Sequence, residues 1–141
     1  MYNDTNLIYI LTILEAIEKI KIYSDGFETA DDFFWANQQL NFNGTLNLLI
    51  AIGEESKKID AKLKQEFPDM KWKEIAGMRD RLAHDYRGID PNIVWSVIGS
   101  ELEKLKEIAI KMLERIDFKQ ELLLEAINTR FFAHLSYLKN S

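Results

Sequence analysis

The spacing of apolar residues is the feature that most restricts the fold of this chain. Near its start they recur at intervals of three or four positions, at Leu7, Leu11, Leu14 and Ile17. This is the period of a half-buried helix, because an α-helix has about 3.6 residues per turn. We therefore predict a helix over residues 4–23, with Glu15 lying off the apolar stripe and away from the core.

Similar stripes and the turn residues between them predict the remaining helices. Ser24-Asp25-Gly26, Pro68-Asp69 and Gly88 are typical helix terminators, and Asp90-Pro91 is a typical helix start. Further helices are predicted around residues 33–35, then over 38–67 (with a break near Asn43-Gly44 left open), 71–86, 90–115 and 117–137. Gly and Pro together number only eight, which favours long helices over strands and turns. We predict one all-α domain, an up-and-down bundle of four long helices with one or two accessory helices.

The amino-acid composition excludes several classes of function for this chain. The chain has no cysteine, which excludes disulfides, thiolate catalysis and sulfur-ligated metals. Neither histidine has a glutamate three positions earlier, as the metal sites of carboxylate-bridged bundles require. We predict no metal and no cofactor. The first residues lack the basic start of a signal peptide and no apolar run is long enough to span a membrane, so we predict a cytoplasmic protein without a membrane partner.

Residues 78–88 concentrate the reactive side chains. These eleven residues hold three arginines, two aspartates, a tyrosine and one of the two histidines. The net charge of the chain is −5, yet the segment from Lys71 to Arg87 holds five basic and three acidic residues. If a polyanion binds this chain, it should therefore bind there.

A helical wheel divides this segment. Ile75, Met78 and Leu82 fall on one side and form the predicted core face, and His84 falls on the opposite side. Asp80 shares the face of His84 and could hold one ring nitrogen. Because the core face is already occupied, His84 is either solvated or directed at a substrate or partner.

Arg79 flanks the core face, and Tyr86, seven residues on, lies almost directly above it. The spacing of Arg79 and His84 does not place both on one face. A joint site needs a frayed helix end, the reach of the arginine, or a second subunit.

Arginine and histidine together suit phosphoryl transfer in RNA. A guanidinium can bind a phosphate with two hydrogen bonds and neutralise charge that develops in the transition state. An imidazole can take the proton from a ribose 2′-hydroxyl or give one to the leaving 5′-oxygen.

The string Arg79-x4-His84-x-Tyr86 resembles the signature of the HepT toxins, a branch of the HEPN superfamily. Four flanking motifs are similar to the family pattern and stand in its order: Leu14-Glu15-Ala16-Ile17, Ile52-Gly53-Glu54-Glu55, Trp72-Lys73-Glu74-Ile75-Ala76-Gly77-Met78 and Ile93-Val94-Trp95. The resemblance covers residues 6–115. It implies a HepT-like HEPN domain over residues 1–115, and we expect residues 116–141 to be a helical extension packed on the same domain.

The resemblance also implies a function. HEPN bundles form dimers in which two such motifs face one cleft, and many are metal-independent endoribonucleases. By this resemblance Arg79 and His84 are catalytic, Asp80 is supporting, and the substrate is RNA, either tRNA or mRNA. Lys73, Arg81 and Arg87 are expected to bind RNA. A homodimer or a larger oligomer is expected.

HepT toxins of type VII toxin-antitoxin systems are neutralised by an MntA-like nucleotidyltransferase antitoxin. The resemblance implies that this antitoxin transfers AMP to Tyr86, which adds bulk and negative charge beside the RNA site. The other interpretation of Tyr86 is a buried or hydrogen-bonded aromatic residue. The alternative function is a noncatalytic HEPN interaction module that binds a nucleotidyltransferase or a nucleotide.

The sequence also suggests roles for Gly53, Glu54 and His134. Gly53 interrupts a predicted helix, and either close helix packing or room for a ligand or partner explains a glycine there. Glu54 is expected to pair with an arginine of the 71–86 helix. His134 follows Arg130 by four positions, but its neighbours are apolar, so we expect a structural role with no acidic group close by.

Overall fold

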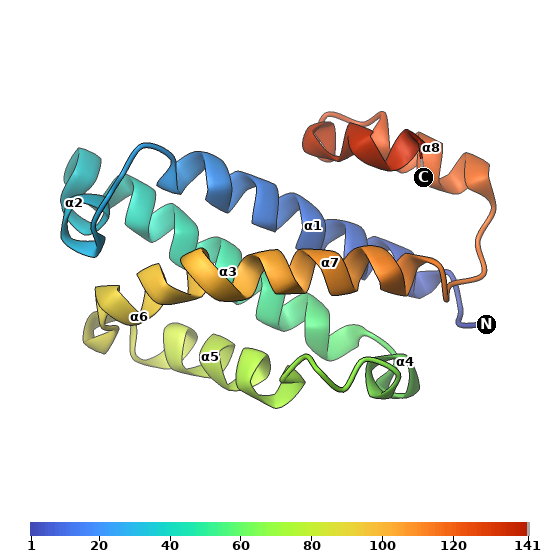
Figure 1. Cartoon of the computed structure of the whole chain (residues 1–141), viewed down its shortest axis with the longest axis horizontal. Coiled ribbons are helices and arrows are strands. Elements are labelled where there is room, and N and C mark those ends of the chain that lie inside the picture. The colour runs from blue at the N-terminus through green and yellow to red at the C-terminus, as the bar shows by residue number, and fades with distance from the viewer. Residues whose placement is uncertain (141) are drawn as a thin grey trace.

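The chain folds into an all-α bundle built on four long segments, as predicted. The computed structural model describes residues 1–140, except for the side chains of Tyr86 and Asn140. The long segments are α1 (Thr5–Ser24), α3 (Leu40–Lys58), α5 (Trp72–His84), and α6 (Pro91–Ser96) followed by the π-helical turn Val97–Glu101 and α7 (Leu102–Leu113). Figure 1 shows α1, α3 and α7 side by side, with α5 packed along α3. The described residues contain no β-strand.

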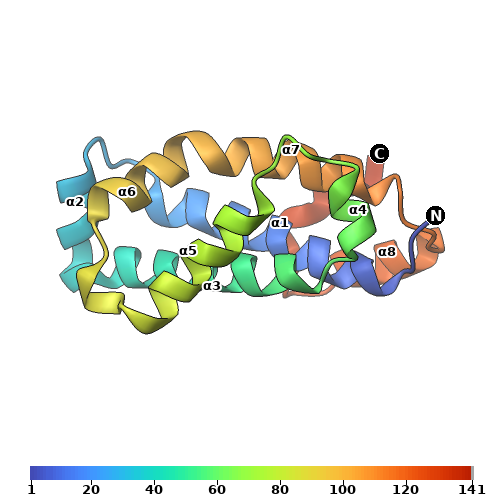
Figure 2. The same cartoon turned by 90° about the horizontal axis from the view of Figure 1, so that it is seen from below.

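Short helices and 3₁₀ turns lie at the ends and along one side of the bundle. The helices are α2 (Ala30–Trp35), α4 (Ala61–Gln65) and α8 (Gln120–Ile127), with 3₁₀ turns at Ala36–Gln39, Tyr86–Gly88 and Ala133–Asn140. In the view from below, α2 and α6 lie at one end of the bundle and α4 at the other (Figure 2). The predicted short helix near residue 33 is α2, and the Thr29 hydroxyl caps it by accepting a hydrogen bond from the Asp32 N–H at 3.1 Å.

The central helix is α1, which is buried on nearly all sides. Its fully buried side chains are Ile10, Leu11, Ile13, Leu14, Ile17 and Ile20. Each contributes roughly 1.5–3 kcal/mol relative to an exposed position. Helices α3 and α7 cover two sides of α1, and the C-terminal segment lies over a third (Figure 1). The prediction that Glu15 lies away from the core was wrong, since this third cover buries its side chain to 2% exposure.

The predicted helix over 38–67 is two helices. Ile59 is extended (φ −63°, ψ 139°), and Asp60 starts α4 by accepting a hydrogen bond from the Lys62 N–H at 2.9 Å. The Asp60 N–H in turn donates to the Asn6 side chain at 2.9 Å. The break therefore lies at residues 59–60. The chain remains helical at Asn43-Gly44, where the absence of a side chain on Gly44 admits the ring of Tyr23.

Helix α5 ends two residues earlier than predicted, at His84 instead of Tyr86. Asp85 leaves the helical region (φ −132°, ψ 55°), although its N–H still donates to the Arg81 carbonyl at 2.8 Å. The negative charge of Asp85 would interact unfavourably with the helix dipole at the C-terminus. The basic side chains of the last turn, Arg81 and His84, suit this end of the helix. Tyr86 therefore belongs to a separate 3₁₀ turn, and the prediction that it lies above Arg79 on one helix was wrong.

The predicted C-terminal helix over 117–137 is also divided. Only Gln120–Ile127 is α-helical, and the chain then turns before the 3₁₀ segment Ala133–Asn140. The turn brings Phe132, Leu135 and Leu138 onto the bundle, where all three are buried. A straight helix could not place these residues and Leu123 against the same surface. Within residues 1–140, no helix combines the length and hydropathy required to cross a membrane.

Candidate functional site

Arg79, the first residue of the signature, lies on α5 where this helix packs against Gly53 of α3. A Cβ added to Gly53 of α3 would fall 2.3 Å from Arg79 Cβ and 2.9 Å from Arg79 Cγ. Real Cβ atoms do not approach this closely, so only glycine permits this approach of the two helices. Of the two explanations for Gly53, close helix packing is the one observed, and the residue packed against it is Arg79.

Four charged side chains form a closed ring at this crossing. Arg79 forms ion pairs with Glu54 through Nε and with Asp80 through Nη1, the latter at 3.1 Å. Lys57 Nζ lies 2.9 Å from the same Asp80 oxygen and 4.0 Å from the Glu54 oxygen that contacts Arg79. The expected pairing of Glu54 with an arginine of α5 is therefore confirmed. Two residues of α3 and two of α5 alternate in charge around the ring, which carries no net charge.

The ring holds Arg79 in one orientation. Its side chain is 26% exposed, with the stem against Gly53 and two edges of the guanidinium occupied by carboxylates. Hydrogen bonds from Lys57 and Arg79 lower the pKa of Asp80 below its usual value, so this carboxylate stays ionised at neutral pH. A guanidinium fixed in this way can present its remaining N–H groups to a phosphate without first losing side-chain freedom.

His84 is the last residue of α5 and is exposed. No hydrogen bond or ion pair of its imidazole occurs among the residues that the structure describes, so the expected contact with Asp80 is not formed. Asp80 contacts Lys57 and Arg79 instead. At about 100° per residue, His84 and Arg79 lie about 140° apart around the helix axis. Within one chain the structure does not bring the two predicted catalytic side chains together.

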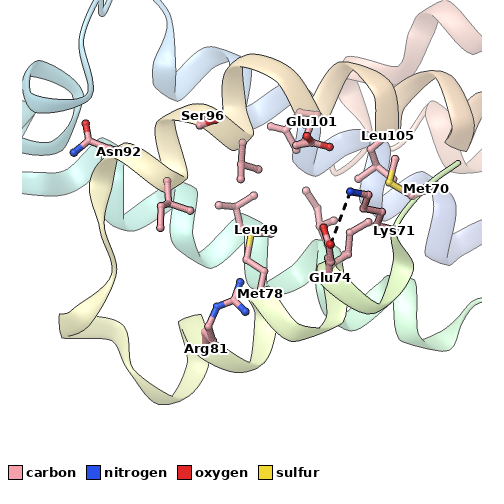
Figure 3. Close-up of a pocket in the computed structure, with 15 residues that line it drawn as sticks. Leu49, Met70, Lys71, Glu74, Met78, Arg81, Asn92, Ser96, Glu101 and Leu105 are labelled. Carbon is pink, nitrogen blue, oxygen red and sulfur yellow. Dashed lines mark ion pairs between the residues drawn. The ribbon is translucent and has the colours of Figure 1, made fainter.

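Arg81 lies on the other side of α5, at the rim of an apolar groove of about 430 Å³. The floor and walls of the groove are aliphatic and come from α3, α5, α6, the π-helical turn and α7: Leu49, Ile52, Ile75, Met78, Ile93, Val97, Leu102 and Leu105. Figure 3 shows Arg81 near Met78, and Lys71 paired with Glu74 farther along the groove at 4.0 Å. The predicted core face of α5 is thus only partly buried, because Leu82 is enclosed while Ile75 and Met78 line the groove.

The other predicted RNA-binding residues are also exposed. Lys73 lies in the first turn of α5 and Arg87 in the 3₁₀ turn after it, so they stand at opposite ends of the helix. The Tyr86 side chain, predicted to accept AMP, lies outside the described residues. The described part of the chain contains no group of three or more His, Asp or Glu side chains placed to hold a metal ion.

His134 has an acidic partner that the sequence did not indicate. Its Nδ1 contacts the carboxylate of Glu15, and its backbone N–H donates to the other Glu15 oxygen at 3.3 Å. The expectation of no acidic group nearby was therefore wrong, although the role is structural, as expected. Beside this pair, Lys106 Nζ lies 4.8 Å from the ring centre of Tyr137, and burial raises the pKa of Tyr137 to about 12.

Lys57 is the site residue that sequence reasoning missed. It lies 23 positions from Asp80 and outside every motif that was recognised. The only available signal was its spacing of four from Gly53 on one helix face, which places it at the same crossing with α5.

Comparisons with known proteins agree on one protein family. A family model described as ribonuclease HepT-like matches residues 13–112. A protein of Methanocaldococcus jannaschii named "Gamma-glutamylcyclotransferase and putative RNase" is 33% identical over 136 residues, which covers 86% of this chain but only 60% of that protein. A protein of Thermococcus cleftensis named "Probable ribonuclease HepT" is 34% identical over 98 residues, which covers 70% of this chain and 86% of that protein. No solved structure gives a significant match.

Proposed function

We propose that this chain, which belongs to the HepT-like ribonuclease family, is an endoribonuclease acting through Arg79 and His84. The observation that carries the proposal is the fixed arginine at the crossing of α3 and α5, on the helix whose last residue is an exposed histidine. The side chain that binds a phosphate is rigid, and the one that moves a proton is free to meet substrate.

In the proposed reaction His84 takes the proton of a ribose 2′-hydroxyl, and the 2′-oxygen forms a bond to the adjacent phosphorus. The bond from phosphorus to the 5′-oxygen breaks, and this oxygen receives a proton from an imidazolium. The products end in a 2′,3′-cyclic phosphate and a 5′-hydroxyl. Arg79 binds the phosphate and neutralises the charge that develops on its oxygens. Asp80 supports Arg79, and Lys73, Arg81 and Arg87 attract the RNA backbone.

The proposed site is shared by two copies of the chain, because Arg79 and His84 lie far apart around one helix. Mixing the Arg79→Ala and His84→Ala variants tests this arrangement. For an inter-subunit site, random pairing should restore about a quarter of wild-type activity, since half of the dimers are mixed and each retains one intact pair. If subunits are shown to exchange and no activity returns, both residues of a working site must lie on one chain.

Product chemistry tests the activity itself. The purified protein should cleave a tRNA or mRNA substrate in the presence of EDTA and leave 2′,3′-cyclic phosphate ends, which mass spectrometry identifies. A DNA strand of the same sequence lacks the 2′-hydroxyl and should remain intact. Cleavage of both strands, or loss of RNA cleavage with EDTA, would rule out the proposed reaction.

We propose further that the protein is the toxin of a type VII pair neutralised by an MntA-like nucleotidyltransferase. The phenol oxygen of Tyr86 would attack the α-phosphorus of ATP, releasing pyrophosphate and the phenol proton. The support is the position of Tyr86 two residues after His84 in the signature, because a bound AMP there adds negative charge where RNA must approach. Intact mass after coexpression with an MntA-like nucleotidyltransferase should increase by AMP units and should not do so for Tyr86→Phe. Unchanged addition to that variant would move the acceptor elsewhere.

The second candidate function is a noncatalytic module that binds a nucleotidyltransferase or a nucleotide. Two observations favour it: the net charge of −5 and the neutralisation of Arg79 by two carboxylates in this chain. This candidate predicts tight binding of the nucleotidyltransferase by a protein that cleaves none of the tRNA and mRNA substrates.

A further inference from the structure

A lysine outside the signature takes part in the charge ring at the site. Lys57 Nζ lies 2.9 Å from Asp80 Oδ1, the same oxygen that lies 3.1 Å from Arg79 Nη1. Lys57 stands one turn after Gly53 on α3, so the close contact of the two helices keeps it within reach of Asp80. This position is the only one in the ring for which neither the signature nor its flanking motifs account.

Asp80 presents a problem for a phosphate-binding arginine. A carboxylate bound to the guanidinium competes with a phosphate for the same donors and repels the negative charge of the RNA. Glu54 already neutralises Arg79 from the α3 side. With Asp80 added and without Lys57, the group around Arg79 would carry a net charge of −1.

Lys57 reduces both the competition of Asp80 for the guanidinium and the repulsion of Asp80 toward RNA. Because it shares the Asp80 oxygen with Arg79, part of the charge of that carboxylate is directed to the ammonium group, and the ring as a whole is neutral. Lys57 is 38% exposed and Arg79 is 26% exposed, so the pair lies at the surface where an RNA backbone can approach. The guanidinium is then held in position by Glu54, and its side chain remains partly exposed to a phosphate.

We infer that Lys57 is a positioning residue of the ribonuclease site, which acts through Asp80 to keep Arg79 available to the phosphate of RNA. This inference rests on the proposed ribonuclease activity. Loss of the ammonium group should weaken RNA binding and leave the chemical step nearly unchanged. The expected change is a rise in KM with little change in kcat.

A double-mutant cycle separates this role from a direct contact with RNA. Lys57→Met keeps the length of the side chain and removes its charge. The matched control is Lys58→Met, which removes the same charge at the next position, where the ammonium group pairs with Glu55 at 3.2 Å and lies above the ring of Tyr9. Asp80→Asn removes the competing carboxylate, and Lys57→Arg restores a positive charge. KM and kcat are measured for one RNA oligonucleotide at fixed ionic strength.

Lys57→Met should raise KM about three- to fivefold, the upper range for exposed ion pairs. Lys57→Arg should return KM toward the wild-type value, and Lys58→Met should leave it unchanged. In the Asp80→Asn background, Lys57→Met should change KM far less. An equal fold change in both backgrounds, or an equal effect of Lys58→Met, would overturn the inference and leave the proposed function standing. A wild-type protein that cleaves no RNA would overturn both.

Discussion

Replacement of Gly53 by alanine tests the packing that positions Arg79. The added Cβ would meet Arg79 Cβ at 2.3 Å, whereas carbon atoms pack at about 3.5–4.0 Å. Arg79 Cβ is fixed to the backbone of α5 and cannot rotate away. To accept the new methyl group, α5 must therefore move from α3 by more than about 1 Å at this crossing.

Two opposing effects set the magnitude. Alanine is favoured over glycine within a helix by about 1 kcal/mol, and forcing a methyl group into a packed contact costs typically about 1–3 kcal/mol. Gly99 provides the matched control, since it is a helical glycine with nothing within 4 Å of an added Cβ. The propensity term cancels between the two variants. Gly53→Ala should therefore be less stable than Gly99→Ala by about 1–3 kcal/mol.

Urea unfolding of both variants, followed by circular dichroism, measures this difference. Cleavage of RNA measures the second consequence, because displacement of a catalytic group by about 1 Å can reduce the rate by up to about 10²-fold. Gly99→Ala should cleave at the wild-type rate. A Gly53→Ala protein as stable as Gly99→Ala would refute the packing argument, and wild-type cleavage by it would show that the position of α5 against α3 is unimportant.

Two further predictions concern charged groups. His134→Ala should lower the free energy of unfolding by about 1–3 kcal/mol, because it leaves the buried Glu15 carboxylate without its side-chain partner. The exposed control Arg130→Ala should change it by less than about 0.5 kcal/mol, and equal values would contradict this role of His134. The lowered pKa of Asp80 implies a stabilising contribution that is present above its unfolded pKa and lost as pH falls through the folded pKa. NMR titration of the Asp80 carboxyl carbon should give a midpoint below 3.8 that rises in Lys57→Met, and an unchanged midpoint would argue against the contact.

Local sequence patterns were sufficient to predict the fold class and the family. The apolar stripe of α1 and the Asp90-Pro91 start of α6 depend on near neighbours in the chain, and both are present in the structure. The resemblance based on Arg79, His84 and the flanking motifs is confirmed by the family model over residues 13–112.

Contacts between distant segments were not predictable. Glu15 is buried because His134 reaches it from 119 positions away, and no helical period contains that information. The break after Lys58 depends on Asp60 bonding to Asn6, which is equally remote. The Lys57 contact with Asp80 forms only because Gly53 lets two helices approach, so the composition of the site was predicted only in part.

The basic residues predicted to form one site on α5 do not share one face of the helix. A count of charges over residues 71–87 treated this stretch as one basic surface, whereas Arg79 and Arg81 emerge on opposite sides of the helix. Glu54, from outside that stretch, cancels part of its charge. Charge counted along the sequence therefore overstated the positive potential near Arg79.

His84 is proposed to transfer protons during RNA cleavage, and the cleavage rate of His84→Ala tests this role most directly. The imidazole is exposed and has no hydrogen bond within the described part of the chain, so its removal should leave stability and oligomeric mass unchanged. Loss of a general acid or base typically reduces the rate about 10²- to 10⁴-fold. We predict a loss within that range for a folded variant of wild-type oligomeric mass. Cleavage by His84→Ala at the wild-type rate would contradict the account.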